Sequence, residues 1–259
     1  MIISSLKATA IFALVLFLSA CVTVTESRFS KKANSNKAAE SYVALGVAYM
    51  TQGNMALARQ KLDRALELEP ENISAHSAMA TYWLERGEEP LAVKEFKIAL
   101  DLDDSHSPSN YHYGRYLMVY KQDKRACGYI AIAASDVNYS ARSLANESLG
   151  KCWIINGQPS KAIDAYEKAW VLNSESVPAC FNLASIYYKR HRFDLALRWF
   201  KRFESSLKAS NSKHSAASLK MGWRLAKANR DKNAADNFAF KLKKRFPKSR
   251  EYKRISGKQ

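Results

Sequence analysis

The chain has few of the residues that interrupt helices. Among its 259 residues there are nine Gly and six Pro, and these two residue types are the strongest local breakers of regular structure. Hydrophobic residues make up 47% of the chain and charged residues 25%, which is enough apolar surface for a folded core. The composition therefore favours a folded, mainly helical protein.

The N-terminal apolar run is too short to cross a membrane. After Lys7 comes ATAIFALVLFLSA, about 13 residues, which fits a signal-peptide core rather than a span of ~20 residues. Leu18, Ser19 and Ala20 lead directly into Cys21. This pattern resembles a bacterial lipobox, which implies cleavage after residues 1–20 and acyl chains on the sulfur and the new amino group of Cys21. An ordinary secretory signal with an incidental cysteine is the alternative.

Residues 21–38 are expected to be the lipidated cysteine and a flexible tether. The stretch VTVTESRFSKKANSNKA shows no helical or strand periodicity and is rich in Ser, Thr, Asn and Lys, as linkers are. The folded part is then held near the membrane.

The motifs of common catalytic and metal sites are missing. No H-E-x-x-H, G-x-S-x-G, phosphate-cradling glycine loop or Cys-x-x-Cys pair occurs. The histidines are far apart in sequence: His76, His106, His112, His191 and His214. We therefore expect no enzymatic activity, no metal site and no cofactor.

Internal repeats are the strongest signal in the sequence. Copies of 34 residues start at Ala39 and Ile73 and align without a gap, which is the period of tetratricopeptide repeats. Positions 8, 11, 20, 24 and 27 of the first copy are Gly46, Tyr49, Ala58, Leu62 and Ala65, and those of the second are Ala80, Trp83, Ala92, Phe96 and Ala99. Four further copies follow, so the predicted repeats span 39–72, 73–106, 107–140, 143–176, 177–210 and 215–248.

The later copies become irregular. Phe203 replaces the small residue at position 27 of the fifth copy, and Lys241 replaces it in the sixth. A degenerate last copy is typical of a capping repeat. Small residues at positions 8, 20 and 27 let two antiparallel helices approach, and stacked hairpins bury a continuous core. We predict an all-α tetratricopeptide superhelix over residues 39–255, with a concave groove lined by the first helix of each repeat.

Beyond the repeats, nearly all of residues 15–255 resembles the type IV pilus pilotins of Gram-negative bacteria, the PilF/PilW group. The resemblance depends on CVT at Cys21, on NYHYGRYL in the third repeat, and on the ending RLAKANRDKNAADNFAFKLKKRFPKSREY. It implies a lipoprotein anchored in the outer membrane and facing the periplasm, a monomer before assembly. This protein would bind the pilus secretin and promote its localisation and multimer assembly. A scaffold of the same architecture that serves another secretin or a cell-wall complex is the alternative.

The groove positions of the first three repeats predict the binding surface. Positions 2, 5, 9, 12 and 13 of each first helix face the groove in tetratricopeptide folds, and in the first three repeats they offer an apolar strip with one cation. The candidate partner-binding residues are Val43, Val47, Met50, Leu84, Tyr111, Arg115 and Met118. An exposed apolar strip suits an amphipathic helix or strand of a partner. The same spacing also fits side chains that pack into the core.

Two other binding classes are less consistent with the residues. Repeat modules that clamp terminal carboxylates need Lys and Asn where this chain has Val43 and Val47. The basic ending KLKKRFPKSREYKR could attract nucleic acid by counterion release, but a lipidated periplasmic chain seldom meets any. Anionic lipid headgroups, cell-wall polymers or a merely solvated helix remain open for this segment.

Three cysteines remain when Cys21 is lipidated. Cys127 is expected on the second helix of repeat three and Cys152 on the first helix of repeat four, which should be neighbours. An oxidising periplasm permits a disulfide between them, with Cys180 left as a buried thiol. Three small hydrophobic residues in helix seams are the alternative.

Overall fold

The structure is a computed structural model that describes residues 28–257. The predicted signal peptide and Cys21 lie outside this range. Within it the chain forms helices and no strand, and none of these helices is long and apolar enough to cross a membrane. The predicted all-α repeat superhelix is confirmed.

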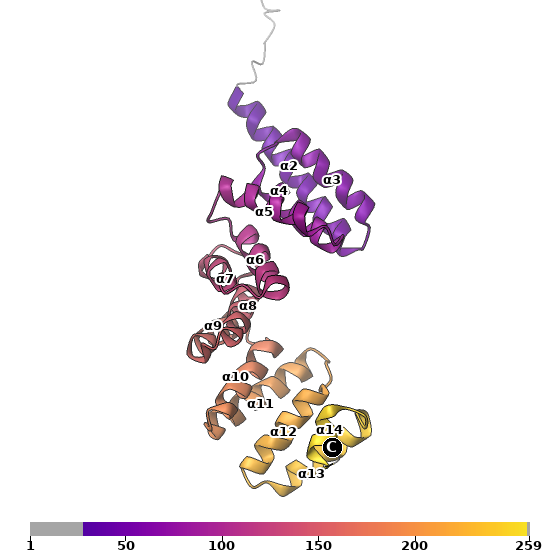
Figure 1. The fold of residues 1–259 in the computed structure, drawn as a ribbon, viewed down its shortest axis with the longest axis vertical. Helices are drawn as coiled ribbons and strands as arrows, with labels where there is room; N and C mark the ends of the chain where they lie inside the picture. Colours follow the sequence, from indigo (N-terminus) through magenta and orange to yellow (C-terminus); the bar gives the residue numbers. More distant parts are fainter. Residues whose placement is uncertain (1–27, 258–259) are drawn as a thin grey trace, which may run out of the picture.

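The helices pair as six antiparallel hairpins that stack into a curved, elongated molecule (Figure 1). The first helices are α2 (Arg28–Thr51), α4 (Ile73–Glu85), α6 (Ser107–Tyr116), α8 (Arg142–Ile155), α10 (Val177–Lys189) and α12 (Ala216–Ala228). The second helices are α3 (Met55–Leu68), α5 (Glu89–Leu102), α7 (Ala126–Ser135), α9 (Pro159–Leu172), α11 (Phe193–Ala209) and α13 (Lys232–Arg245). A π-helical turn, η1 (Leu117–Lys121), continues α6, and the short α14 (Arg250–Ile255) packs against α12 and α13.

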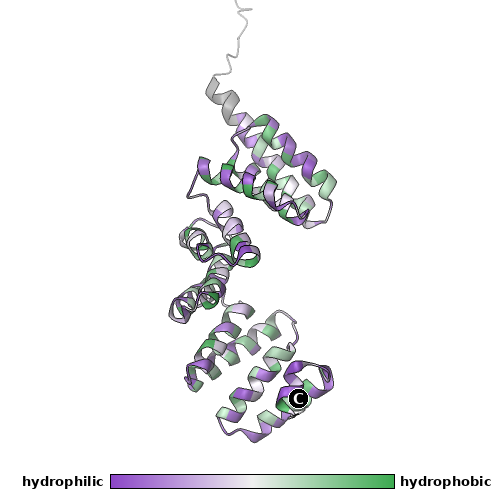
Figure 2. Cartoon of the chain, viewed as in Figure 1, coloured by the Kyte–Doolittle hydropathy of each residue, from purple (hydrophilic) through white to green (hydrophobic). Residues whose placement is uncertain are grey.

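Each helix carries both hydrophobic and hydrophilic residues (Figure 2), and its apolar face is buried in the stack. The residue at position 24 is the centre of each hairpin, and in the first five repeats it is at most 2% exposed. These residues are Leu62, Phe96, Ile130, Tyr166 and Phe200. The small residues at position 20 of the same repeats are fully buried, so the side chains that define the repeat are the ones that form its core.

Glycine at position 8 allows the two helices of a hairpin to approach closely. A Cβ added to Gly150 would lie 2.8 Å from the ring of Tyr166, and one added to Gly114 would lie 2.7 Å from Ile130. The same holds for Gly46 against Leu62 at 2.8 Å. Contacts this short are repulsive, so a side chain at these positions would force the helices apart.

Polar residues at position 4 secure the turns between repeats. Asn110 donates to the carbonyl oxygen of Asp104 at 2.7 Å, and Asn146 donates to that of Ala134 at 3.2 Å. The His76 ring bridges the Pro70 carbonyl oxygen at 2.9 Å and the Glu95 carboxylate at 2.6 Å. Burial lowers the pKa of His76, but the bonds to Glu95 and to the Pro70 carbonyl, together with the charge of Glu95, outweigh burial and the net shift of the pKa is upward. His76 therefore has a structural role.

Helix α2 begins inside the segment that the sequence predicted to be a flexible tether. Residues 21–38 were expected to lack regular structure, but α2 begins at Arg28. The extra turns are held by two later segments: Ser35 donates to the carbonyl oxygen of Leu68 at the end of α3 at 3.0 Å, and Asn72, the N-cap of α4, donates to Asn36 at 3.3 Å. These long-range bonds stabilise the first turns of α2, whose own sequence shows no periodic apolar face.

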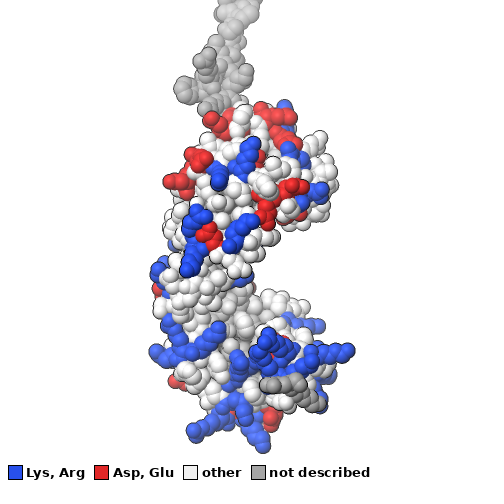
Figure 3. Space-filling model, viewed as in Figure 1, with Lys and Arg blue, Asp and Glu red and all other residues white. Residues whose placement is uncertain are grey.

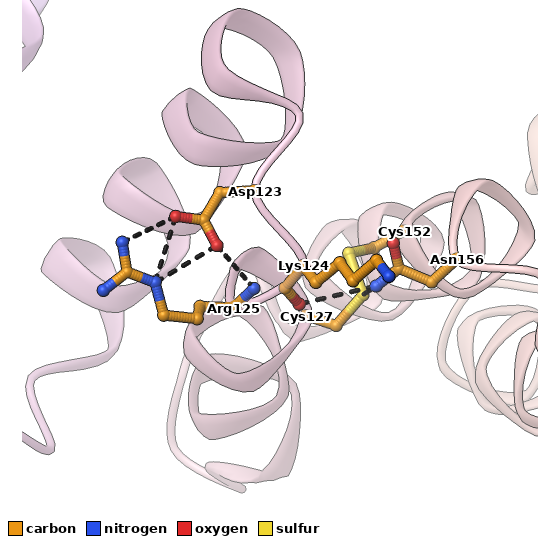
Figure 4. The surroundings of a disulfide bond; sticks show 6 residues. All are labelled: Asp123, Lys124, Arg125, Cys127, Cys152 and Asn156. Carbon is orange, nitrogen blue, oxygen red and sulfur yellow. Dashed lines mark hydrogen bonds and ion pairs between the residues drawn. A yellow bond between two sulfur atoms is a disulfide. The ribbon is translucent and has the colours of Figure 1, made fainter.

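A disulfide joins the third and fourth repeats (Figure 4). Cys127 on α7 and Cys152 on α8 are bonded, with their Cα atoms 5.6 Å apart, and the Asn156 amide donates to the Cys127 Sγ at 3.2 Å. The predicted pairing is present, and Cys180 is a buried free thiol whose pKa is raised by burial.

We predict that Gly150→Ala lowers the free energy of unfolding by about 1–3 kcal/mol relative to Gly128→Ala. Both glycines are inside helices, so both variants gain the same helix propensity of about 1 kcal/mol. A Cβ on Gly128 meets nothing within 4 Å, which makes it the matched control. Urea denaturation of the two variants measures the difference, and equal stabilities would contradict the close-approach argument.

Removing the disulfide should destabilise the stack. With the two cysteines 25 residues apart, the loop-closure estimate for Cys127→Ser/Cys152→Ser is a loss of about 3.5 kcal/mol. Thermal unfolding with and without reductant tests this expectation. Reductant should lower the Tm of the native chain and leave the double variant unchanged, because Cys180 is unpaired. A native chain insensitive to full reduction would contradict the prediction.

Candidate functional site: a groove on the first three repeats

Two adjoining hollows form a groove along the first helices of repeats one to three. The first has a volume of about 290 Å³ and is walled by α2, α4 and the start of α6. The second, about 210 Å³, is walled by α4, α6 and η1. Thr81 and His112 line both hollows, so the two are continuous.

The first hollow is mainly apolar. Its α2 wall consists of Val43, Ala44, Val47 and Met50, with Glu40 at one end. Val47 is 43% exposed, whereas Val43 and Met50 are mostly covered and offer only part of their surface. The opposite wall is formed by small side chains of α4 and by residues of α6, namely Ser74, Ser77, Ala78, Thr81, His106, Pro108 and His112.

The second hollow is more polar. Leu84 and Val119 give it apolar walls, Arg115 and Glu85 carry its charges, and Tyr120 is 59% exposed at its edge. The Arg115 guanidinium lies 5.4 Å from the ring centre of Tyr111. Arg115 is thus the one cation among the side chains that line the two hollows.

His112 is uncharged at neutral pH. Burial, and to a smaller extent the neighbouring Arg115 cation, lower its pKa to about 4. The pKa of His106 is also lowered by burial. The groove therefore presents two neutral imidazoles to a partner, and its lining stays apolar in character.

The structure divides the seven predicted groove residues. Val43, Val47 and Met50 line the first hollow, and Leu84 and Arg115 line the second. Tyr111 and Met118 line neither hollow and are core residues, only 2% and 6% exposed, so their assignment to the groove is wrong.

Tyr111 and Met118 are buried for different physical reasons. Tyr111 is covered from two sides, since it packs with Ala134 of its own hairpin and with Ala145 on α8 of the next repeat. Met118 lies in the π-helical turn η1, which fits more residues into one turn than an α-helix does and so rotates the following side chains. Met118 is turned into the cluster that contains the disulfide, while Val119 and Tyr120 take the groove side. The repeat spacing contains no signal for this turn.

Residues 28–257 contain no group of three or more His, Cys, Asp or Glu side chains placed to hold a metal ion. The pairs that do form are structural: His76 with Glu95, and His214 with Glu204 at 3.8 Å. The groove is a binding surface lined by apolar and weakly polar side chains.

Comparisons with known proteins agree with the repeat architecture. The tetratricopeptide repeat family model matches residues 39–72. The type IV pilus assembly protein PilF of Pseudomonas aeruginosa is 28% identical over 256 residues, which cover 98% of this chain and 100% of the relative.

Solved structures extend the comparison to three dimensions. The structure of Pseudomonas aeruginosa PilF superposes with a TM-score of 0.78 at 29% identity, covering 87% of this chain and 100% of that one. PilW, described as a widely conserved type IV pilus biogenesis factor, has a TM-score of 0.70 at 23% identity over 85% of this chain and 99% of that one, and this match shows the common fold. The chain is a PilF/PilW-like tetratricopeptide repeat protein.

Proposed function

We propose that the protein is a type IV pilus biogenesis factor that binds a segment of the pilus secretin in the groove of repeats one to three. The observation that carries the proposal is an open, mainly apolar groove in a chain that matches PilF over nearly its full length. An extended concave surface of this kind suits a peptide or helix of a partner.

The groove can recognise an amphipathic segment. Val43, Val47 and Met50 supply an apolar wall, against which the apolar face of a helix or strand would lose its contact with water. Arg115 supplies a single positive charge in the second hollow. A carboxylate on the partner, or the carbonyl end of its helix, would pair with Arg115 and set the direction of the bound segment.

Lipidation of Cys21 is the second part of the proposal and accounts for localisation at the outer membrane. One acyl chain binds a membrane only marginally, while several give stable anchoring. The chain between Cys21 and Arg28 can reach at most about 25 Å. Val47 lies ~29 Å further along α2, so the groove would stay close to the bilayer surface.

The mechanism is escort without chemistry. A secretin segment held in the groove shares the membrane anchor of the protein, which raises its local concentration at the target bilayer and favours assembly of the pore. Binding and anchoring are separate properties of different residues, so they can be tested separately.

Substitution of Val47 tests groove binding. Val47→Asp places an unpaired charge in the apolar hollow and should weaken partner binding at least about tenfold. Leu45→Asp is the matched control, because Leu45 is on the same helix and 45% exposed but does not line the hollow. Both variants should keep the helical circular dichroism of the native chain, since exposed substitutions cost little stability.

The measurement is cross-linking in envelopes of the native cell, followed by mass spectrometry of partners and linked residues. We expect the pilus secretin to be captured by the native chain and by Leu45→Asp, with cross-links in repeats one to three, and to be lost with Val47→Asp. Capture of a different secretin or of cell-wall enzymes instead would replace the pilus role with that of another envelope scaffold.

Substitution of Cys21 tests the anchor. Cys21→Ala removes the acylated sulfur, so the protein should move from the outer-membrane fraction to the soluble fraction after a high-salt wash. The purified variant should still bind the secretin, because Cys21 is far from the groove in sequence. Retention of Cys21→Ala in the membrane fraction would show that lipidation does not hold the protein there.

A further inference from the structure

Charge is unevenly distributed along the stack. Residues 193–257 contain 18 Lys and Arg against 5 Asp and Glu, whereas residues 39–106 contain 6 against 12. Figure 3 shows Lys and Arg crowding the end of the molecule formed by the last helices, with acidic side chains mostly on the first repeats. The basic character of the protein is therefore a property of one end.

The cations at this end are exposed and unpaired. Eight lie between residues 241 and 254, all exposed: Lys241, Lys243, Lys244, Arg245, Lys248, Arg250, Lys253 and Arg254. We call this set the basic end. Among the described residues none of the eight forms an ion pair, while Arg59 and Arg64 in the first repeat pair with Asp63 and Glu67. The same segment contains a single carboxylate, Glu251, and forms no ion pair with it, so the basic end carries a large excess of positive charge.

The cations also crowd one another. Burial lowers the pKa of Lys220 on α12, and the nearby Arg224 and Arg254 lower it further. Mutual repulsion of this kind is relieved when an anionic partner binds.

A large apolar side chain stands within this cationic surface. Phe240 on α13 is 64% exposed, and Lys243 and Lys244 follow it by about one helical turn. The core of the hairpin uses Phe238 instead, whose ring would meet a Cβ on Gly222 at 2.5 Å. Phe240 therefore has no part in closing the hairpin. An exposed aromatic residue beside lysines is typical of a helix that lies in a membrane interface.

Local structural roles explain only some of these charges. Lys243, Lys244 and Arg245 occupy the last turn of α13, where cations stabilise the helix terminus. Arg250 occupies the first residue of α14, where a cation is unfavourable. Lys253 and Arg254 occupy the last turn of α14, which is again favourable. Lys241 and Lys248 lie outside both last turns, so helix stability does not account for the whole set.

We propose that the basic end is a docking surface for anionic phospholipid headgroups, with Phe240 inserted at the bilayer interface. Clusters of four to eight Lys and Arg on a helix are typical of anionic-lipid recognition. Single-stranded nucleic acid is normally held by several aromatic platforms in a groove. Here Phe240 is the one strongly exposed aromatic residue of the described chain after residue 192.

The surface is independent of the groove and of the N-terminal anchor. It lies at the opposite end of the elongated stack from α2 (Figure 1). A membrane contact at the basic end would therefore be a second attachment, separate from any made by Cys21, and its failure would leave the proposed secretin binding unaffected.

The test captures vesicles on beads that carry the full chain, immobilised through its N-terminus. Fluorescent vesicles contain phosphatidylcholine alone or phosphatidylcholine mixed with phosphatidylglycerol. Lys243→Glu/Lys244→Glu is compared with Lys124→Glu/Lys168→Glu, which makes the same change in net charge on exposed residues of repeats three and four. All variants have the same N-terminal segment. Any vesicles bound by that segment therefore contribute equally to the signal of every variant.

We expect Lys243→Glu/Lys244→Glu to weaken binding of the phosphatidylglycerol vesicles at least about thirtyfold, and the control pair to change it less than about threefold. Phe240→Ser should weaken it roughly tenfold without changing its dependence on salt. Circular dichroism checks that each variant is folded.

Three outcomes would overturn the proposal. The first is equal loss of binding with the two double variants, and the second is equal capture of vesicles with and without phosphatidylglycerol. The third is capture of a duplex or single-stranded oligonucleotide with no capture of vesicles, which would assign the basic end to nucleic acid.

Discussion

The close approach of the two helices in each hairpin is the constraint on which the rest of the structure depends. Wherever glycine stands at position 8, the partner helix places a large side chain against its bare backbone, as Tyr166 does at Gly150. Alanines at positions 20 and 27 keep the same spacing in the first four repeats. Since these contacts recur with each repeat, the hairpins stack with a similar geometry and their first helices line up as one surface.

An irregularity in the third repeat shapes the second hollow of that surface. The π-helical turn after Tyr116 turns Met118 into the core and leaves Val119 and Tyr120 on the groove side. The disulfide between Cys127 and Cys152 lies in the same apolar cluster as Met118. The turn and the covalent link are therefore parts of one local structure, and π-turns are frequent at functional sites.

The two ends of the stack have different chemistry. The first repeats are acidic outside an apolar groove, and the last helices are basic with one exposed aromatic side chain. A solenoid permits this separation because each repeat contacts only its neighbours. Surface residues at one end can therefore change without disturbing the packing at the other.

The sequence by itself determined the repeat, its period and most of the core, because small and large residues at fixed positions leave only one way to pack. It also indicated Cys127 and Cys152 as neighbours, since consecutive repeats adjoin. The tertiary structure alone decided the early start of α2, which depends on bonds from Ser35 to Leu68 and from Asn72 to Asn36. It also decided which side of the third repeat faces the groove. A change of one residue in a helical turn rotates every side chain after it, and no residue pattern in the repeat records that change.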